Sequence, residues 1–241
     1  MMKQIFYPLV LGLLMLGGCS KDKEETPVVL TGEYQVGNTI VTAPIAMYTN
    51  MGAVNNQAVV DGYLRRQQLS ATYFSRTDVP TSYPNQLAII IRDNKQVSLV
   101  TYYPNRADTV KANITSQLAK YAVLSLRDST GLFSSASATD RCAQLAALIP
   151  TENPVKRCVN VSQATGYSQY CKYRPVQVVG INAGQLYIPV LSWSLKASST
   201  YSYCGWASYG SWNLFNKAAL NQLVAGDTLV VQERSIALNK K

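Results

Sequence analysis

The sequence predicts a mainly β protein, in which an antiparallel meander forms a sandwich or a barrel with one or two short helices. Short runs of apolar and polar residues recur between turn residues about every ten positions, as in antiparallel folds. The expected helices do not alternate with the strands, which argues against a parallel α/β sheet. Charged residues make up only 15% of the chain, while Ser, Thr, Asn, Gln and 16 Tyr supply its polarity. That balance suits an exported β-rich protein.

The N-terminus has the layout of a secretory signal peptide. Lys3 supplies a positive charge, an apolar run extends over residues 5–16, and small residues follow. The run is shorter than the roughly 20 residues that span a bilayer, and Pro8 interrupts it. We therefore expect residues 1–18 to be a cleaved signal peptide.

A cysteine stands where the apolar run gives way to charge. The sequence Leu16-Gly17-Gly18-Cys19 resembles the lipobox of bacterial lipoproteins, in which the cysteine is acylated and becomes the first residue. The resemblance implies that acylated Cys19 anchors the chain to the lipid bilayer and that residues 19–29 form a flexible tether. The charged residues 20–25 look like the export signal of Bacteroidota-type surface lipoproteins. An ordinary thiol and a solvated spacer are the alternatives. We expect an outer membrane location, facing the periplasm or the cell surface.

Residues 30–128 are expected to form an N-terminal β meander. Its clearest hairpin joins residues 87–92 and 96–103 through the turn Asp93-Asn94-Lys95. The second arm of this hairpin alternates apolar and polar residues, which indicates one buried face. The remaining strands are predicted at residues 30–36, 39–48, 68–76, 109–116 and 121–127.

The start of the meander carries a second resemblance. Leu30-Thr31-Gly32-Glu33-Tyr34 is similar to the Leu-x-Gly-x-aromatic beginning of the first strand in lipocalin-like lipoprotein domains. The resemblance covers about residues 30–130 and implies a barrel that binds a small apolar ligand. The cysteine-containing segment that follows departs from the pattern of a simple eight-stranded barrel.

Residues 129–170 are expected to combine loops with one short helix. Residues 129–139 are rich in Ser, Thr, Ala and Gly, which is typical of a linker or an exposed loop. Thr139 or Asp140 is placed to cap a helix over residues 142–148, which Pro150 ends. The cysteine-rich remainder up to Gln169 is expected to be irregular.

Residues 171–241 are expected to form a C-terminal β segment that packs with the first meander as one domain. Strands are predicted at residues 176–180, 185–193 and 227–233, with a turn at Asn182-Ala183-Gly184. A helix over residues 214–224 is expected to end at Gly226. Pro189 suits an edge position, because it cannot donate a ladder hydrogen bond.

Four cysteines remain besides Cys19: Cys142, Cys158, Cys171 and Cys204. An even number in a chain bound for an oxidising compartment predicts two disulfides. Three pairings are open, and we favour Cys142 with Cys158 and Cys171 with Cys204 because each staples a local segment. A zinc site is disfavoured, since the chain has no CxxC pair and no histidine. We expect no metal and no cofactor.

The absence of histidine excludes Ser-His-Asp and Cys-His triads. No nucleophile elbow, Walker loop or dinucleotide fingerprint occurs either, so no catalytic residue is assigned. The net charge of +9 is scattered along the sequence, which argues against nucleic acid as a partner. A glycan hydrolase that uses two carboxylates is the enzyme alternative, and an accessory subunit of a surface complex is a third possibility.

One aromatic stretch is the candidate ligand platform for a glycan or a small apolar ligand. Its aromatics alternate with Gly and Ser, and Tyr and Trp combine an apolar face with a polar edge. The alternative is that these side chains face the core or cover a disulfide. The candidates are Tyr201, Tyr203, Trp206, Tyr209 and Trp212. We therefore expect a non-enzymatic envelope lipoprotein that binds a ligand or plays a structural part.

Overall fold

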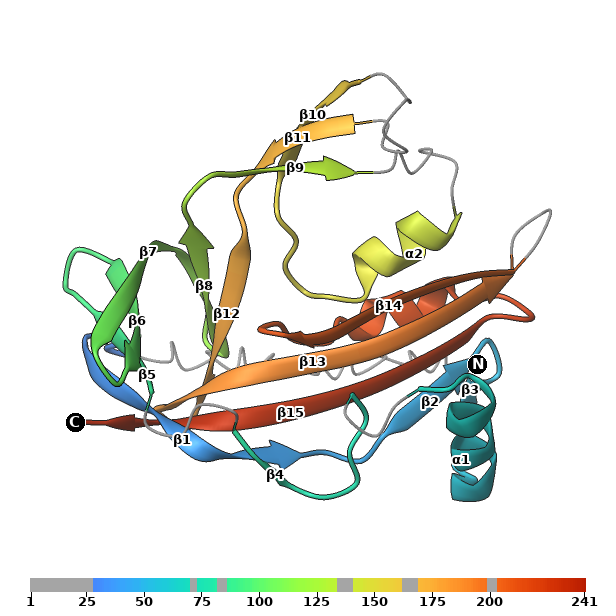
Figure 1. Ribbon diagram of the computed structural model, residues 1–241. Helices are drawn as coiled ribbons and strands as arrows, with labels where there is room; N and C mark the ends of the chain where they lie inside the picture. The colour runs from blue at the N-terminus through green and yellow to red at the C-terminus, as the bar shows by residue number, and fades with distance from the viewer. Residues whose placement is uncertain (1–27, 70–72, 82–85, 134–140, 162–168, 199–202) are drawn as a thin grey trace, which may run out of the picture.

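The computed structural model describes residues 28–69, 73–81, 86–133, 141–161, 169–198 and 203–241. Its main feature is an antiparallel barrel of eight strands, which confirms the predicted β class (Figure 1). The strands follow one another around the barrel in chain order, and β15 closes it by pairing with both β1 and β13. The strands are β1 (Gly32–Thr42), β5 (Leu87–Ile91), β6 (Gln96–Tyr103), β7 (Arg106–Gln117), β8 (Tyr121–Leu126), β12 (Val176–Asn182), β13 (Gln185–Ser198) and β15 (Thr228–Lys240).

The two longest C-terminal strands, β13 and β15, continue past the barrel. With their neighbours they form an open extension of the sheet, which we call the platform. There β14 (Tyr203–Ser211) pairs with β13, and β2 (Ala46–Thr49) pairs with β15. Two short strands complete the sheet: β3 (Gly52–Ala53) pairs with β2, and β4 (Val79–Pro80) pairs with β1. One helix, α1 (Gln57–Arg66), covers one face of the platform, while α2 (Arg141–Leu148) and the 3₁₀ helix η2 (Lys217–Gln222) cover the other.

Alternation along the shared strands separates three apolar cores. On β15, Ile236 and Leu238 point into the barrel, Val230 packs under α1, and Leu229 and Val231 pack under α2. This is the period of two that a strand imposes on its side chains. The barrel core also contains Tyr34, Val36, Ile89, Ile91, Val97, Leu99, Ala112, Ile114, Ala122, Leu124, Val179, Ile181, Leu186, Ile188 and Val190.

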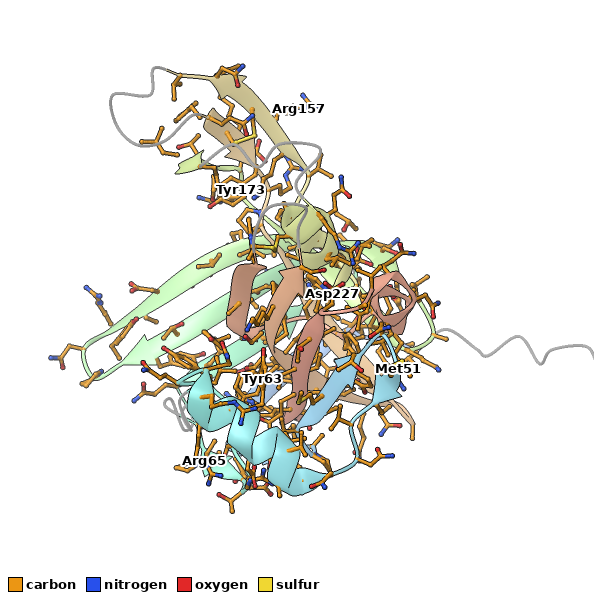
Figure 2. The ribbon with its side chains drawn as sticks, turned by 90° about the vertical axis from the view of Figure 1, so that its right-hand side faces the viewer. Met51, Tyr63, Arg65, Arg157, Tyr173 and Asp227 are labelled. Carbon is orange, nitrogen blue, oxygen red and sulfur yellow. A yellow bond between two sulfur atoms is a disulfide. The ribbon has the colours of Figure 1, made fainter. Side chains whose placement is uncertain are left out.

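A second, smaller sheet stands away from the barrel. It consists of β9 (Ser129–Phe133), β11 (Gln169–Tyr173) and β10 (Lys156–Asn160), with β11 in the middle. Figure 2 shows this sheet, labelled at Arg157 and Tyr173, at the opposite end of the molecule from α1. The expectation of a loop at residues 129–133 and of irregular chain up to Gln169 is therefore wrong where the structure describes it. These strands are short and polar, and their pairing depends on partners distant in sequence.

The favoured sequential disulfide pairing is also wrong. The bonds join Cys142 to Cys204 and Cys158 to Cys171. Cys158 and Cys171 occupy directly opposite positions on β10 and β11, with Cα atoms 4.0 Å apart. Cys142 lies on α2, which packs against the platform, and this brings it to Cys204 on β14 with a Cα separation of 6.3 Å. Strand register and helix docking, rather than nearness in sequence, decide the pairing.

Two further expectations change around α1. The described residues of the predicted strand 68–76 form turns rather than a strand, and α1 precedes them. Asn56 caps α1, because its side chain accepts hydrogen bonds from the backbone N–H groups of Ala58 and Val59. Only Val60 and Tyr63 of the helix are buried, so its sequence carries a weak apolar stripe.

The C-terminal half largely follows the expected order of elements. The helix predicted over residues 214–224 is the shorter 3₁₀ helix η2, which Asn216 caps. Pro189 pairs with Ser235 of β15, while the β12 pairing ends at Tyr187 and the β14 pairing begins at Leu191. Pro189 therefore lies on an interior strand rather than at an edge, at a position between the β12 and β14 pairings. Within the described ranges, no helix is long and apolar enough to cross a membrane.

Candidate functional site

A cavity of about 570 Å³ opens where the barrel meets the platform. Three barrel strands, β1, β13 and β15, supply its apolar wall through Val36, Ile40, Ile188, Val190 and Ile236. These side chains belong to the barrel core or pack against it, so the cavity is a continuation of the barrel interior. Apolar clefts of this size in the mouths of β-barrels are common ligand sites.

Aromatic side chains from distant parts of the chain form the rim of the cavity. Tyr73 stacks on Tyr209 with ring centroids 3.9 Å apart and planes 16° from parallel, and Phe74 packs edge-on against Tyr209 at 6.1 Å. Tyr103 and Trp212 also line the opening. Burial, with a smaller contribution from Tyr73, raises the pKa of Tyr209. The Tyr209 phenol is therefore neutral at physiological pH, and the rim presents aromatic faces to the cavity.

The segment that carries Tyr73 is held in place by a buried amide on β15. Gln232 is fully buried; its Oε1 accepts a hydrogen bond from the Ser75 backbone N–H at 2.9 Å. Its Nε2 donates to the backbone carbonyls of Ala43 and Ser75. A side chain of the barrel wall thus positions the loop that covers this end of the barrel.

Arg234 is the single charged residue of the cavity lining that the structure describes, and it is 8% exposed. Its Nη2 donates to Ser192 Oγ at 2.9 Å, and the same oxygen accepts a hydrogen bond from the Gly210 backbone N–H at 3.2 Å. Its Nε is buried without a hydrogen-bond partner. Burial lowers the pKa of Arg234, yet a guanidinium stays protonated in proteins. The cavity therefore holds a positive charge on an otherwise uncharged wall.

The structure places the described residues of the predicted aromatic ligand surface in two different hollows. Tyr209 and Trp212 line the cavity, whereas Trp206 is 43% exposed and lies beside Tyr63 and Cys204 in a smaller neighbouring hollow of about 380 Å³. Tyr201 and the side chain of Tyr203 lie outside the described residues.

Sequence reasoning did not find Tyr73, Tyr103 or Arg234. Tyr73 and Tyr103 lie more than 100 positions from Tyr209, and only barrel closure brings them to the same opening. Arg234 lies on a strand that was predicted only as far as Glu233. A local signal existed there, because Gln232 and Arg234 interrupt an apolar alternation with two polar residues on the inward side.

Other chemistry finds little support in the described part of the chain. The described lining of the cavity contains no carboxylate and thus no acid pair of the kind that glycoside hydrolysis uses. No group of three His, Cys, Asp or Glu side chains is placed to hold a metal there. A second hollow, of about 590 Å³, is lined mainly by polar residues on and beside β6, β7 and β8, and its Arg174 forms an exposed ion pair with Asp128. The apolar cavity is therefore the stronger candidate site.

No family model matches this chain, and neither a curated protein nor a solved structure matches it. Its function has to be argued from the geometry of the cavity.

Proposed function

We propose that the protein is an envelope lipoprotein whose barrel binds a small apolar or amphiphilic ligand. The observation that carries this proposal is the cavity of about 570 Å³, with its apolar wall and aromatic rim. Cys19 lies outside the described residues, and its acylation remains a prediction from the lipobox. The anchor would hold the chain at the bilayer, while the cavity would hold the ligand.

The cavity is better suited to binding than to catalysis. Its described lining offers phenol, indole, hydroxyl and guanidinium groups, but no general base and no activated nucleophile. The ligand would bury its apolar surface against the aliphatic wall, and such burial contributes roughly 25 cal/mol per Å². A lipocalin-like mode of binding, with the ligand entering through the barrel mouth, is the form of the proposal that this arrangement favours.

Filling the cavity tests the binding proposal. In the full chain, Val190→Phe places a ring in the apolar wall, and Val159→Phe makes the same change on β10, where the side chain is 62% exposed. We expect a neutral naphthylamine fluorophore to bind the wild type and Val159→Phe, and to bind Val190→Phe at least about tenfold more weakly. Equal binding to all three forms, or no binding to the wild type, would contradict the proposal.

Labelling tests the anchor independently of the cavity. Cells that express the full chain are grown with a clickable palmitate analogue, and the label on the wild type is compared with that on Cys19→Ala. We expect the label to be lost in Cys19→Ala and to be retained in Cys158→Ala/Cys171→Ala, which removes both cysteines of a disulfide and leaves Cys19 in place. Equal labelling of the wild type and Cys19→Ala would rule out acylation at this residue.

A further inference from the structure

We infer that the ligand of the cavity is an anionic amphiphile, whose carboxylate or phosphate head binds Arg234 and whose apolar chain lies along the barrel wall. This inference rests on the proposed ligand-binding function and specifies the class of the ligand. It follows from a charge that the described residues leave uncompensated.

Among the described residues, Arg234 is the one arginine that is both buried and without an ion pair, since the other arginines without an ion pair are exposed to solvent. Arg76, Arg106, Arg141 and Arg174 each form an ion pair with an aspartate, whereas Arg234 is buried and forms none with any described residue. An isolated charge in an apolar environment is among the most costly groups to bury, and such charges are normally paired. A mobile anion would supply the partner that the wall lacks.

The hydrogen bonds of Arg234 favour an oxyanion over a neutral polar group. A guanidinium carries five N–H donors, and only Nη2 donates to an acceptor among the described residues. Its planar fork matches the two oxygens of a carboxylate or phosphate, and charge-assisted bonds are about twice as strong as neutral ones. The hydroxyl group of Thr101 lines the same cavity and offers a further donor to the head.

The position of Arg234 along β15 fixes the direction of the ligand. Ile236 and Leu238 follow it on the inward side of the strand and belong to the barrel core. On its other side, Gln232 and the loop that it holds close the platform end. An apolar chain attached to a head at Arg234 would therefore extend past Ile236 along the aliphatic wall, with the aromatic rim beside it.

A matched set of ligands tests the charge preference. The full chain is placed in phosphatidylcholine nanodiscs at pH 7, and the naphthylamine fluorophore is displaced by decanoate, decyl phosphate or 1-decanol, with empty nanodiscs as the blank. We expect at least one of the two anions to displace the fluorophore at about 10- to 100-fold lower concentration than the alcohol. The tighter of the two anions identifies the head group.

Variants of Arg234 connect that preference to the residue. In Arg234→Met, the anion and the alcohol should displace the fluorophore at about the same concentration, while the fluorophore itself still binds. Arg234→Lys should retain part of the preference for the anion. Arg65→Met, an exposed change on α1, is the matched control and should leave it intact. If the wild type binds the alcohol as tightly as both anions, or Arg234→Met keeps the preference, the inference fails while the binding proposal stands. If the wild type does not bind the fluorophore at all, the proposed function itself is overturned.

Thermal unfolding provides a second readout that does not depend on affinity. Removal of an uncompensated buried charge relieves a desolvation cost, so Arg234→Met should unfold at the same or a higher temperature than the wild type without ligand. Decanoate or decyl phosphate should raise the unfolding temperature of the wild type and not that of Arg234→Met. A ligand-induced rise of equal size in both forms would contradict the role of Arg234.

Discussion

At the scale of single residues, Asp227 is the most heavily bonded carboxylate that the structure describes. Its Oδ1 accepts a hydrogen bond from the Ser198 backbone N–H at 2.8 Å, and its Oδ2 accepts one from the Val224 backbone N–H at 2.8 Å. Arg141 of α2 forms an ion pair with the same carboxylate. Because these partners belong to β13, to the turn after η2 and to α2, one buried side chain joins three parts of the fold.

Replacement of this carboxylate should destabilise the fold. Asp227→Asn keeps the shape of the side chain but removes its charge. The new amide N–H groups would also face one of the donors that the carboxylate now accepts from. We expect the free energy of unfolding at pH 7 to fall by about 3 kcal/mol, as urea denaturation would measure it. Asp108→Asn, at an exposed ion pair on β7, should change it by less than about 0.5 kcal/mol. Equal effects of the two variants would show that the Asp227 contacts are not stabilising.

The same residue predicts an acid-dependent loss of stability. Burial alone would raise the pKa of Asp227, but the N–H groups of Val224 and Ser198 and the Arg141 guanidinium together lower it. Since the folded-state pKa is lower than the unfolded one, the stabilisation is complete above about pH 4 and is lost as the pH falls toward the folded value. The stability difference between wild type and Asp227→Asn should therefore shrink below about pH 4. A difference that stays constant down to pH 2 would contradict this assignment.

At the scale of elements, the β12–β13 hairpin combines a favourable turn with a glycine under a ring. Ala183 and Gly184 have φ values of 48° and 80°, which fits a two-residue hairpin turn of type I′. Gly180 lies opposite Tyr187, and the ring of Tyr187 occupies the space that a Cβ at position 180 would need. The tyrosine therefore packs over the glycine and covers the gap in the strand.

A double-mutant cycle measures this contact. Gly180→Ala should lower the free energy of unfolding by about 1–3 kcal/mol, because the ring of Tyr187 has to move. In the background of Tyr187→Ala, the same glycine substitution should cost much less, since nothing then fills that space. Urea denaturation of the four forms gives the coupling energy. A cost that is the same in both backgrounds would show that the ring does not hold the glycine in place.

The two disulfides should contribute very differently to stability. Cys142–Cys204 closes a loop of 62 positions and ties α2 to β14, with Cys142 fully buried, whereas Cys158–Cys171 clamps strands that pair only within the small sheet. We expect Cys142→Ala/Cys204→Ala to lower the free energy of unfolding by about 4 kcal/mol. Cys158→Ala/Cys171→Ala should change the main unfolding transition by less than about 1 kcal/mol and speed amide exchange in β10 and β11. The reverse order of the two costs would contradict this assignment.

Elements specified by local signals were predictable from the sequence, and elements that depend on distant partners were not. The turn at Asp93-Asn94-Lys95 and the turn at residues 182–184 both join neighbouring strands, so turn residues and alternation identify them. The helix α1 and the small sheet carry weak periodicity, and their packing partners lie elsewhere in the chain. The disulfide pairing failed for the same reason, because register and docking set it.

At the scale of the whole molecule, β13 and β15 belong to both the barrel and the platform, and the cavity forms where the two meet. The aromatic pattern identified Tyr209 and Trp212, which lie at this junction. Tyr73 and Arg234 were not identified, since their proximity to these aromatics exists only after the barrel closes. The candidate site is thus a product of topology more than of any motif.

The pairing of the first and last strands of the barrel brings Glu33 and Lys241 together. Lys241 donates its backbone N–H to the Glu33 carbonyl at 2.9 Å, and their side chains form an ion pair. A circular permutant that links Lys241 to Thr31 through a short glycine-serine linker, and opens the exposed turn after Pro104, should therefore fold with the wild-type circular dichroism spectrum. A group attached after Lys241 would therefore leave the barrel at the same place as one attached before Glu33.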